Sequence, residues 1–565
     1  MAIKNRSFYQ ENTIDVTVEV NNEILHGKLQ FGGFRIPSFR LQNYSSSAAS
    51  AFFAHAFDIN ELTCTSLNGG ETYTLHKTKI REGTVLADFI TEGKQQSHFD
   101  TFELHLTGIS VWIEGQRGLN INGDCIERHY NTETISEPFH FDSNNYNLST
   151  THRIETHSET PVEGHFNIDH TLVIRKTEGF FTFEECRKVS HELRNLFSLL
   201  VGNSLSVKEV WIFNHEDPAR YRWIYFLTVL YAQEPLRHSF DSLSSFSELT
   251  QERKWAELLS NYFSKDIFRT IWNRLVPSYG KMGAWEYDIL SRVVILEMYS
   301  GVKTTKKKMK LEKRINSDFI KEITNTIDRF ASSRNISGTN QIVFEGMKKS
   351  ILATRNTSLP TLKEKYEALM EEISPPLKDA ISFTDDDFWR IKKLRDSIAH
   401  GFDYDRHNSG DDITHEMQLN DRLLVLLMCF AYLELGLKEN EIASSLLHSH
   451  CRFIGNAGLN KRELSRISGD AIFITLVAPP KSLQLRSYES IVLNHSIETD
   501  TWQLNEELTD KLRTEWFKSG IPVSVDYIRS IAPEKEGQTF ELIQRAYIEC
   551  EGIETEHYLI VLINA

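Results

Sequence analysis

The sequence predicts a multidomain α+β protein with a β-rich N-terminal region, an all-α helical bundle and a small α+β C-terminal domain. Two observations lead to this fold class. The chain has 565 residues, and one hydrophobic core usually serves no more than roughly 250–300. Apolar residues recur with the period of strands before about residue 180 and with the period of helices from about residue 183. The predicted boundaries are residues 1–205 (N-terminal domain), 206–282 (mixed connecting segment), 283–452 (helical domain) and 453–565 (C-terminal domain).

The composition is that of an ordinary globular protein, with 40% hydrophobic and 25% charged residues and a net charge of −15. This charge argues against wrapping nucleic acid over the whole surface, although a local basic patch can still bind phosphate. The polar first residues and the lack of an apolar run of about 20 residues argue against a signal peptide and a membrane span. The 6 cysteines form no CxxC pair, which favours a reducing compartment. We therefore expect a cytoplasmic protein, and no cofactor, since GxGxxG and GK[ST] are missing too.

Strand patterns fill the N-terminal region. Apolar and polar residues alternate over Ile14–Val20 and again over Phe102–Leu106. Two threonine-rich runs flank Asn68-Gly69-Gly70, which predicts a hairpin. The polar stretch 129–150 is predicted to form loops. These elements indicate an antiparallel sandwich or barrel.

The connecting part begins with a helix. The segment 183–201 has helical spacing and is followed by Gly202, which suits a C-cap. Two short apolar strands over 207–213 and 221–231 and two helices within 249–276 come next. The connecting segment could link the domains on either side or extend one of them.

The helical region is predicted to contain several amphipathic helices. One covers 283–301, and another begins near Asn316 or Ser317 and carries an apolar stripe that includes Phe319 and Phe330. The polar stretch 335–383 is expected to be partly irregular. The segment 421–435 is apolar nearly all round, so it is predicted to be buried on all sides or shared with a partner chain.

The most informative segment is the predicted helix after Thr384, a good N-cap, with three aspartates in its first turn and Gly401 as a C-cap. Phe388, Ile391, Leu394 and Ile398 form its apolar stripe. Arg395 falls inside this stripe on a helical wheel. Because a buried guanidinium is costly without a partner, Arg395 must snorkel, pair with an acid, or face an interface that handles anions.

Asp396 and His400 are four residues apart and therefore share one helical face. A carboxylate there can fix the tautomer of an imidazole and raise its pKa, and a helix C-terminus acts in the same direction. His400 is then suited to proton transfer near neutral pH.

Arg395-Asp396-Ser397-Ile398-Ala399-His400, placed late in an amphipathic helix and ahead of a very apolar one, resembles the motif of the HEPN superfamily. Its catalytic members are metal-independent ribonucleases with an arginine, a following polar residue and a histidine. The resemblance covers roughly residues 285–450. A long β-rich part ahead of such a domain is similar to the ApeA proteins of bacterial anti-phage defence. The resemblance implies that the protein cleaves RNA, with transfer RNA cut near the anticodon as the expected substrate. It also implies that cleavage arrests growth of the infected cell.

The residue types suit this chemistry. Cleavage without a metal uses the 2′-hydroxyl of RNA, so a base must take its proton while a cation meets the charge on the phosphoryl oxygens. His400 suits the first task and Arg395 the second, with Asp396 orienting His400. Arg395 and His400 lie about 140° apart at 100° per residue, so one copy does not easily enclose a phosphate. HEPN families pair two protomers, so we expect a homodimer, with the helix 421–435 and its flanks as interface material.

A basic run at 303–314 is the natural place for an RNA backbone in this acidic chain. Further cations lie beside the motif. The candidate RNA-binding residues are Lys392, Lys393, Arg406, Lys303, Lys306, Lys307, Lys308 and Lys310.

Two other readings stay open beside the ribonuclease, which is the first. Arg395 and His400 could be a snorkelling arginine and a helix-end histidine in a non-catalytic module that binds RNA or protein, with Asp396 merely paired with Lys392. A third reading is a metal-dependent hydrolase, built on four N-terminal histidines or on a short cluster near residue 450; these residues are His152, His157, His165, His170, His448, His450 and Cys451. No fixed ligand spacing supports it, so no metal is expected.

Control of the expected nuclease is the part that the sequence leaves open. HEPN toxins neutralised by a nucleotidyltransferase partner often carry tyrosine two residues after the histidine, where this chain has Phe402, which argues against that mode. A phage-derived trigger is expected, with the flanking domains as restraints.

Overall fold

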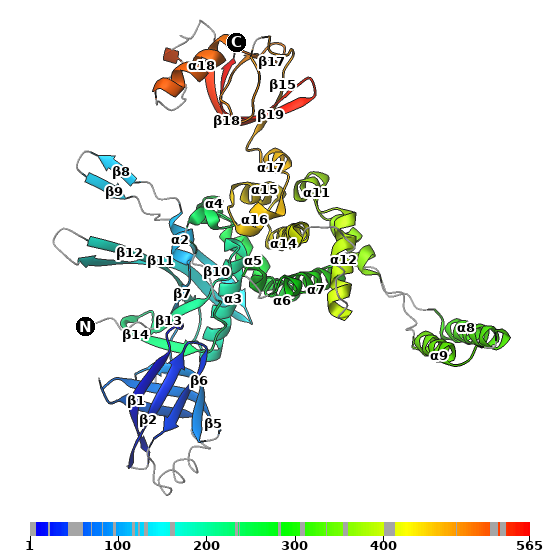
Figure 1. Ribbon diagram of the computed structural model, residues 1–565. Coiled ribbons are helices and arrows are strands. Elements are labelled where there is room, and N and C mark those ends of the chain that lie inside the picture. The colour runs from blue at the N-terminus through cyan, green and yellow to red at the C-terminus, as the bar shows by residue number, and fades with distance from the viewer. Residues whose placement is uncertain are drawn as a thin grey trace. The chain divides into compact units, whose positions relative to one another are not determined.

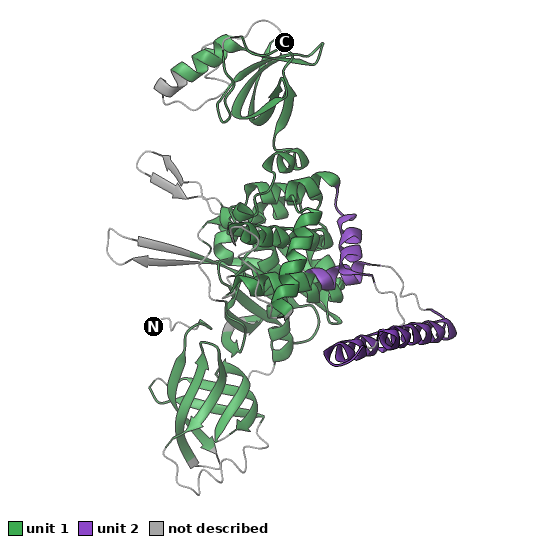
Figure 2. Cartoon of the chain, turned by 45° about the vertical axis from the view of Figure 1, so that its right-hand side comes forward, with its two compact units in different colours: residues 1–295, 375–565 green, residues 296–374 purple. Residues whose placement is uncertain are grey.

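The computed structural model describes most of the chain. The residues outside the description are 1–6, 21–22, 43–59, 69, 82, 94–97, 116–118, 123–124, 129–133, 159–163, 232–235, 237, 281–283, 305–310, 335, 354–359, 401–412, 482, 520–528, 531–537 and 565. The chain divides into two compact units, residues 1–295 with 375–565 and residues 296–374 (Figure 2). The two units are taken in turn below.

The N-terminal part of the first unit contains a closed barrel of six antiparallel strands (Figure 1). The ring closes because β6 pairs with β3 on one side and β5 on the other, in the order β6-β3-β2-β1-β4-β5. Alternating residues such as Val16 and Val18 point into its core. The predicted barrel and the hairpin around Gly70 are confirmed. The strands are β1 (Asn12–Val20), β2 (Glu23–Gly32), β3 (Arg35–Leu41), β4 (Glu61–Ser66), β5 (Thr72–Arg81) and β6 (Thr84–Glu92).

Further strands extend the sheet beyond the barrel to twelve, in the order β10-β11-β12-β7-β13-β14-β6. They are β7 (Thr101–Leu106), β10 (Ser136–Phe141), β11 (Asn144–Ser158), β12 (Gly164–Lys176), β13 (Val207–Asn214) and β14 (Asp217–Phe226). Strands β13 and β14 therefore extend the N-terminal sheet, one of the two alternatives left open for the connecting segment. A separate pair consists of β8 (Leu119–Asn122) and β9 (Cys125–Arg128).

The loops predicted for 129–150 are wrong over 136–150, where β10 and the start of β11 form a hairpin. Four alternating apolar side chains, Phe139, Phe141, Tyr146 and Leu148, are buried there. They outweigh the polar residues between them, because those residues face outward on the same strands.

Helix α3 (Phe183–Val201) begins with a capping box between Thr182 and Glu185 and ends at Gly202, whose φ of 71° is left-handed. This confirms the predicted C-cap. A short helix, α2 (Ile109–Glu114), precedes it on the sheet.

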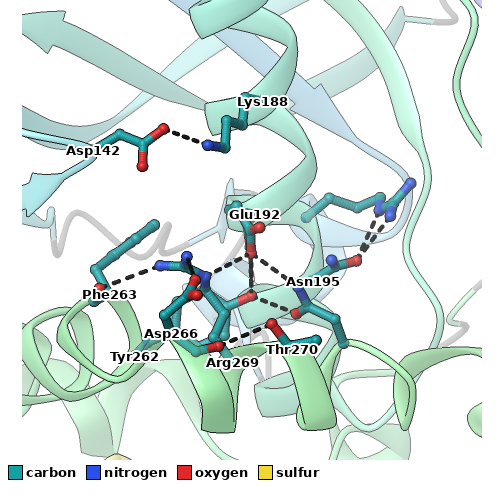
Figure 3. A network of polar contacts seen from close by, with 11 residues as sticks. Asp142, Lys188, Glu192, Asn195, Tyr262, Phe263, Asp266, Arg269 and Thr270 are labelled. Atoms are coloured by element: carbon teal, nitrogen blue, oxygen red, sulfur yellow. Dashed lines mark hydrogen bonds and ion pairs between the residues drawn. The ribbon is translucent and has the colours of Figure 1, made fainter.

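A buried polar network joins α3 to α5 (Trp255–Ser264) and α6 (Asp266–Trp272) (Figure 3). The hydroxyl of Tyr262 donates to Glu192 Oε2 (2.9 Å) and lies 2.7 Å from Asn273 Oδ1. Asn273 Nδ2 donates to the same Glu192 oxygen at 3.0 Å. Helix α3 is thereby held to α5 and to the end of α6 by specific bonds.

The helical part of the first unit surrounds α14 (Ile413–Leu435). Residues Leu423–Tyr432 of this helix are 0–1% exposed in the single chain. The stretch Leu423–Tyr432 is thus buried by its own chain, whereas Asp421, Arg422 and Leu433 are half-buried. The remaining helices of this part are η1 (Ser239–Asp241), α4 (Phe246–Gln251), η2 (Val276–Tyr279), α7 (Trp285–Lys303), α11 (Pro375–Ile381), α12 (Asp385–His400), α15 (Glu439–His448), α16 (Arg452–Ala457) and α17 (Lys461–Ser468).

The second unit takes in the end of α7, α8 (Lys313–Ser333), α9 (Thr339–Leu352) and α10 (Leu362–Met370). Helix α8 begins at Lys313, so the N-cap predicted at Asn316 or Ser317 is wrong; the lysine and arginine before them favour the helix and lengthen it. Neither α8 nor α9 buries any of its residues, and Phe319 and Phe330 of the predicted stripe are 54% and 50% exposed. The stretch 335–383, expected to be partly irregular, is largely helical in its described residues.

The C-terminal domain is α+β, as predicted. Its five strands pair in the order β15-β18-β19-β16-β17, with α18 (Glu506–Ser519) beside them. The strands are β15 (Ile472–Thr475), β16 (Val492–Ser496), β17 (Thr501–Leu504), β18 (Thr539–Cys550) and β19 (Ile553–Asn564). In the described residues no helix is both long and apolar enough to cross a membrane.

Candidate active site on helix α12

Helix α12 carries the predicted motif, and its start is built as expected. The Thr384 hydroxyl accepts the backbone N–H of Asp387 (3.2 Å), and the Asp387 carboxylate accepts that of Thr384 (2.9 Å). This reciprocal cap satisfies two backbone donors that would otherwise have no helical partner. The helix therefore begins at a defined residue, which fixes the register of the motif residues along it.

One face of α12 packs into the helical core. Phe388, Ile391 and Leu394 are 0–2% exposed, while Ile398 is half-buried. The helix contacts α14, and Arg390 Nη2 pairs with the buried carboxylate of Glu416 at 3.2 Å. The predicted apolar stripe is confirmed, and it leaves the opposite face of α12 at the surface.

Arg395 is paired with an acid, one of the three predicted alternatives. Its Nη1 donates to Asp396 Oδ1 at 2.7 Å, and Lys392 Nζ donates to Asp396 Oδ2 at 3.2 Å. The Arg395 side chain is 26% exposed and that of Asp396 37%. Arg395, Asp396 and Lys392 thus form one ion-pair cluster at the surface, where solvent and solutes can reach it.

Asp396 is held as a carboxylate by its neighbours. The hydrogen bond from Arg395 does most to lower the pKa of Asp396 below its usual 3.8; partial burial opposes it, and Lys392 adds to the lowering. Asp396 therefore holds Arg395 and Lys392 close together on one part of the helix. A guanidinium and an ammonium brought together in this way suit binding of a phosphate.

His400 is the last residue of α12, and its side chain lies outside the described residues. Helical spacing puts its position on the same face as Asp396, four residues earlier. Its predicted contact with Asp396 and its role stay predictions. Gly401, Phe402 and Arg406 also lie outside the described residues.

The other predicted RNA-binding residues fall into two groups. Lys393 is exposed on α12 beside Lys392. Lys303, at the end of α7, pairs with Glu372 (3.0 Å), and its Nζ lies 5.6 Å from the Tyr299 ring centroid, so its charge is partly engaged. The rest of the run, Lys306, Lys307, Lys308 and Lys310, lies outside the described residues.

Among the N-terminal histidines, His170 pairs with an acid on helix α2. His170 Nε2 lies 2.5 Å from Glu114 Oε1, and the His170 and His152 rings are 5.8 Å apart. The side chains of His157 and His165 are not described. In the described part of the chain no three His, Cys, Asp or Glu side chains are grouped so as to hold a metal ion.

One residue on α12 was missed by the sequence argument. Trp389 is 45% exposed, on the side opposite the apolar stripe. Lys392 Nζ lies 5.5 Å from the centroid of its ring. The signal was present in the sequence, because a tryptophan on the polar face of an amphipathic helix has no core to enter.

Comparison with known protein families gives one match, to ApeA N-terminal domain 1 over residues 25–256. A search of curated proteins and a search of solved structures each found no match. The matched stretch begins in β2 and ends at the start of α5, so it covers most of the barrel and sheet, whereas Arg395 and His400 lie well outside it. Residues 25–256, somewhat less than half of the chain, are therefore similar to ApeA N-terminal domain 1.

Proposed function

We propose that this chain is a metal-independent endoribonuclease that acts in anti-phage defence, with its reaction centre at the C-terminal half of α12. The observation that carries the proposal is the exposed Arg395–Asp396–Lys392 cluster, one turn before the position of His400 on a capped helix. The match of residues 25–256 to ApeA N-terminal domain 1 supports the proposal, because the sequence resemblance to ApeA proteins implies a nuclease motif in the helical part that follows.

The proposed reaction uses the RNA's own nucleophile. His400 takes the proton of a 2′-hydroxyl, the 2′-oxygen bonds to the adjacent phosphorus, and the bond from phosphorus to the 5′-oxygen breaks. The leaving 5′-oxygen takes up a proton, so the products are a 2′,3′-cyclic phosphate and a 5′-hydroxyl. Arg395 stabilises the charge on the phosphoryl oxygens, and Asp396 holds Arg395 in place while its remaining acceptor capacity serves His400. DNA lacks the nucleophile and is not cut.

The substrate proposed is RNA, specifically transfer RNA near the anticodon, and cleavage would arrest the infected cell. We further propose that two protomers pair so that both copies of the motif face one cleft, since the positions of Arg395 and His400 are about 140° apart around one helix at 100° per residue. The enclosed segment Leu423–Tyr432 does not supply that contact. A phage-derived trigger would release the activity.

The test is to incubate the purified protein with cellular RNA in EDTA, with and without a lysate of phage-infected cells as the source of the trigger, and to sequence the new RNA ends. His400→Ala should lower the rate by about 10²–10⁴-fold, the usual contribution of general acid–base catalysis. Arg395→Ala should also abolish the specific ends. His448→Ala serves as the matched control, because His448 is an exposed histidine on α15. Full activity of His400→Ala would contradict the proposed reaction. Cleavage by the unchanged protein that required added metal would contradict it too.

A second candidate is a non-catalytic module that binds RNA or protein. It is favoured by the engagement of both Asp396 oxygens, since an ion-pair cluster of this kind also forms on helices without any catalytic role. Stable RNA binding with no cleavage in the presence of phage would support this candidate.

A further inference from the structure

Trp389 occupies an unusual place for a large aromatic side chain. Phe388 beside it is 2% exposed and enters the core, whereas Trp389 is 45% exposed on the polar face of α12. The two rings meet edge to face at 5.8 Å between centroids, so one edge of Trp389 is supported by the core. The indole is thus held in place by the helix while nearly half of it stays accessible.

A series of contacts connects this indole to the proposed reaction centre. Lys392 Nζ lies 5.5 Å from the Trp389 ring centroid, and it also donates to Asp396, which in turn accepts from Arg395. Trp389, Lys392, Asp396 and Arg395 therefore form a continuous row along the surface of α12. Lys393 is exposed in the same turn as Lys392.

The spacing of this row suits a strand of RNA. At a rise of about 1.5 Å per residue, Trp389 lies about 9 Å along the helix axis from Arg395 and about 16 Å from the position of His400. These separations correspond to a few nucleotides. A phosphate at Arg395 would therefore leave a neighbouring nucleotide within reach of the indole, with Lys392 and Lys393 beside the backbone between them.

We propose that Trp389 is a stacking platform for an unpaired base next to the scissile phosphate, so that the site selects single-stranded or loop RNA over duplex. The inference rests on the proposed function and names its substrate class. Stacking on an aromatic side chain needs a base whose face is free, which a paired and stacked base in a duplex does not offer. Lys392 and Lys393 complement the negative charge of an RNA backbone, whereas a protein partner with an apolar surface would have no use for them.

Binding is tested in the His400→Ala protein, so that the RNA stays intact. Affinity for a labelled single-stranded RNA is measured by fluorescence anisotropy with Trp389 unchanged, and with Trp389→Phe or Trp389→Leu. Because stacking is worth about 1–3 kcal/mol per base, Trp389→Leu should weaken binding about tenfold or more, and Trp389→Phe much less. Leucine keeps the apolar contact with the core, which protects the fold. Tyr488→Ala, which removes a 71% exposed ring from the C-terminal domain, should leave the affinity unchanged.

A base-by-base control identifies the stacked nucleotide. A set of RNAs is prepared, each with one abasic position. We expect one of them to bind the protein with Trp389 about tenfold more weakly than the intact RNA does. The Trp389→Leu protein should bind that RNA and the intact RNA equally well. Equal affinities for Trp389, Trp389→Phe and Trp389→Leu would overturn the stacking role, as would equal loss on duplex RNA.

The outcome for stacking is separable from that for catalysis. RNA cleavage by the unchanged protein with no effect of Trp389→Leu on affinity or KM would overturn the stacking role and leave the nuclease standing. Binding that depends on Trp389, in a protein that never cleaves, would uphold the platform and remove the nuclease. Failure of the His400→Ala protein to bind any RNA would overturn both.

Discussion

Asp396 holds two cations on one carboxylate, and this changes the role first expected of it. Its Oδ1 accepts from Arg395 and its Oδ2 from Lys392. A carboxylate has about four acceptor sites, so two of them still allow the proposed bond to His400. The arrangement makes Asp396 a positioning residue for Arg395 first, because that contact has the shortest distance in the cluster.

Asp396→Asn is expected to slow RNA cleavage by less than the about 10²–10⁴-fold loss expected for His400→Ala. The amide keeps one oxygen for Arg395 but removes the charge that restrains both cations. The pKa of Asp396 lies below its usual 3.8, so the carboxylate is ionised from pH 5 to 9. The ratio of wild-type to variant rates, measured over that range, should therefore not depend on titration of Asp396.

The stability effect of the same substitution follows from the same shift. A lowered pKa in the folded state stabilises the protein above the unfolded-state value, near 3.8, and the benefit is lost as the pH falls through the folded-state value. Since the side chain is 37% exposed, the contribution is under about 1 kcal/mol. Urea unfolding at pH 7 should show a small difference that disappears in acid; a difference that grows in acid would contradict the pairing.

At the scale of elements, α12 depends on its first turn. The reciprocal bonds between Thr384 and Asp387 define where the helix begins, and the buried stripe sets which face turns outward. A substitution at Thr384 can therefore change the position of Arg395, although the two residues are more than one helical turn apart.

Thr384→Ala should destabilise the protein by about 0.5–2 kcal/mol, the usual cost of losing an N-cap hydroxyl. Thr384→Ser keeps the hydroxyl and should recover most of that loss. Chemical denaturation followed by circular dichroism measures both, and RNA cleavage by the folded Thr384→Ala protein checks whether fraying at the helix start reaches Arg395. Equal stability of the alanine and serine variants would show that the cap bond is unimportant.

At the scale of the whole chain, the Tyr262 network shows how distant segments are joined in the first unit. Glu192 on α3 and Asn273 just after α6 meet at one phenolic hydroxyl (Figure 3). Burial, aided by Glu192, raises the pKa of Tyr262 well above its usual 10, so the hydroxyl stays a neutral donor. Helix α3 is thereby bonded to α5 and to the residue after α6 through a single group.

Tyr262→Phe should therefore cost about 1–3 kcal/mol, because it leaves buried polar partners without their bond. The loss should appear as a lower midpoint of thermal unfolding followed by circular dichroism, since the hydroxyl joins α3 to α5 and to the residue after α6. Tyr488→Phe, at an exposed ring, is the matched control and should have no effect. An unchanged midpoint for Tyr262→Phe would show that these bonds do not stabilise the fold.

Much of the candidate site followed from the sequence because its determinants are local. Thr384, the apolar stripe and the i, i+4 spacing of Asp396 and His400 are read within one helix, and the structure confirms the cap and the stripe. Trp389 was missed although its position on the polar face was visible. The roles of Arg395 and His400 remain predictions, because a role depends on the substrate.

The sequence by itself determined the elements whose signals span a few residues: the hairpin near Gly70, helix α3 with Gly202 at its end, and α12 with its cap. Only the tertiary structure decided how distant segments pair. It closed six strands into a barrel, drew β13 and β14 into the N-terminal sheet, enclosed Leu423–Tyr432 of α14 within one chain and paired Arg390 with Glu416. The physical reason is that capping and amphipathic spacing act between near neighbours in the chain, whereas strand order, burial and ion pairing depend on which far residues arrive at the same place.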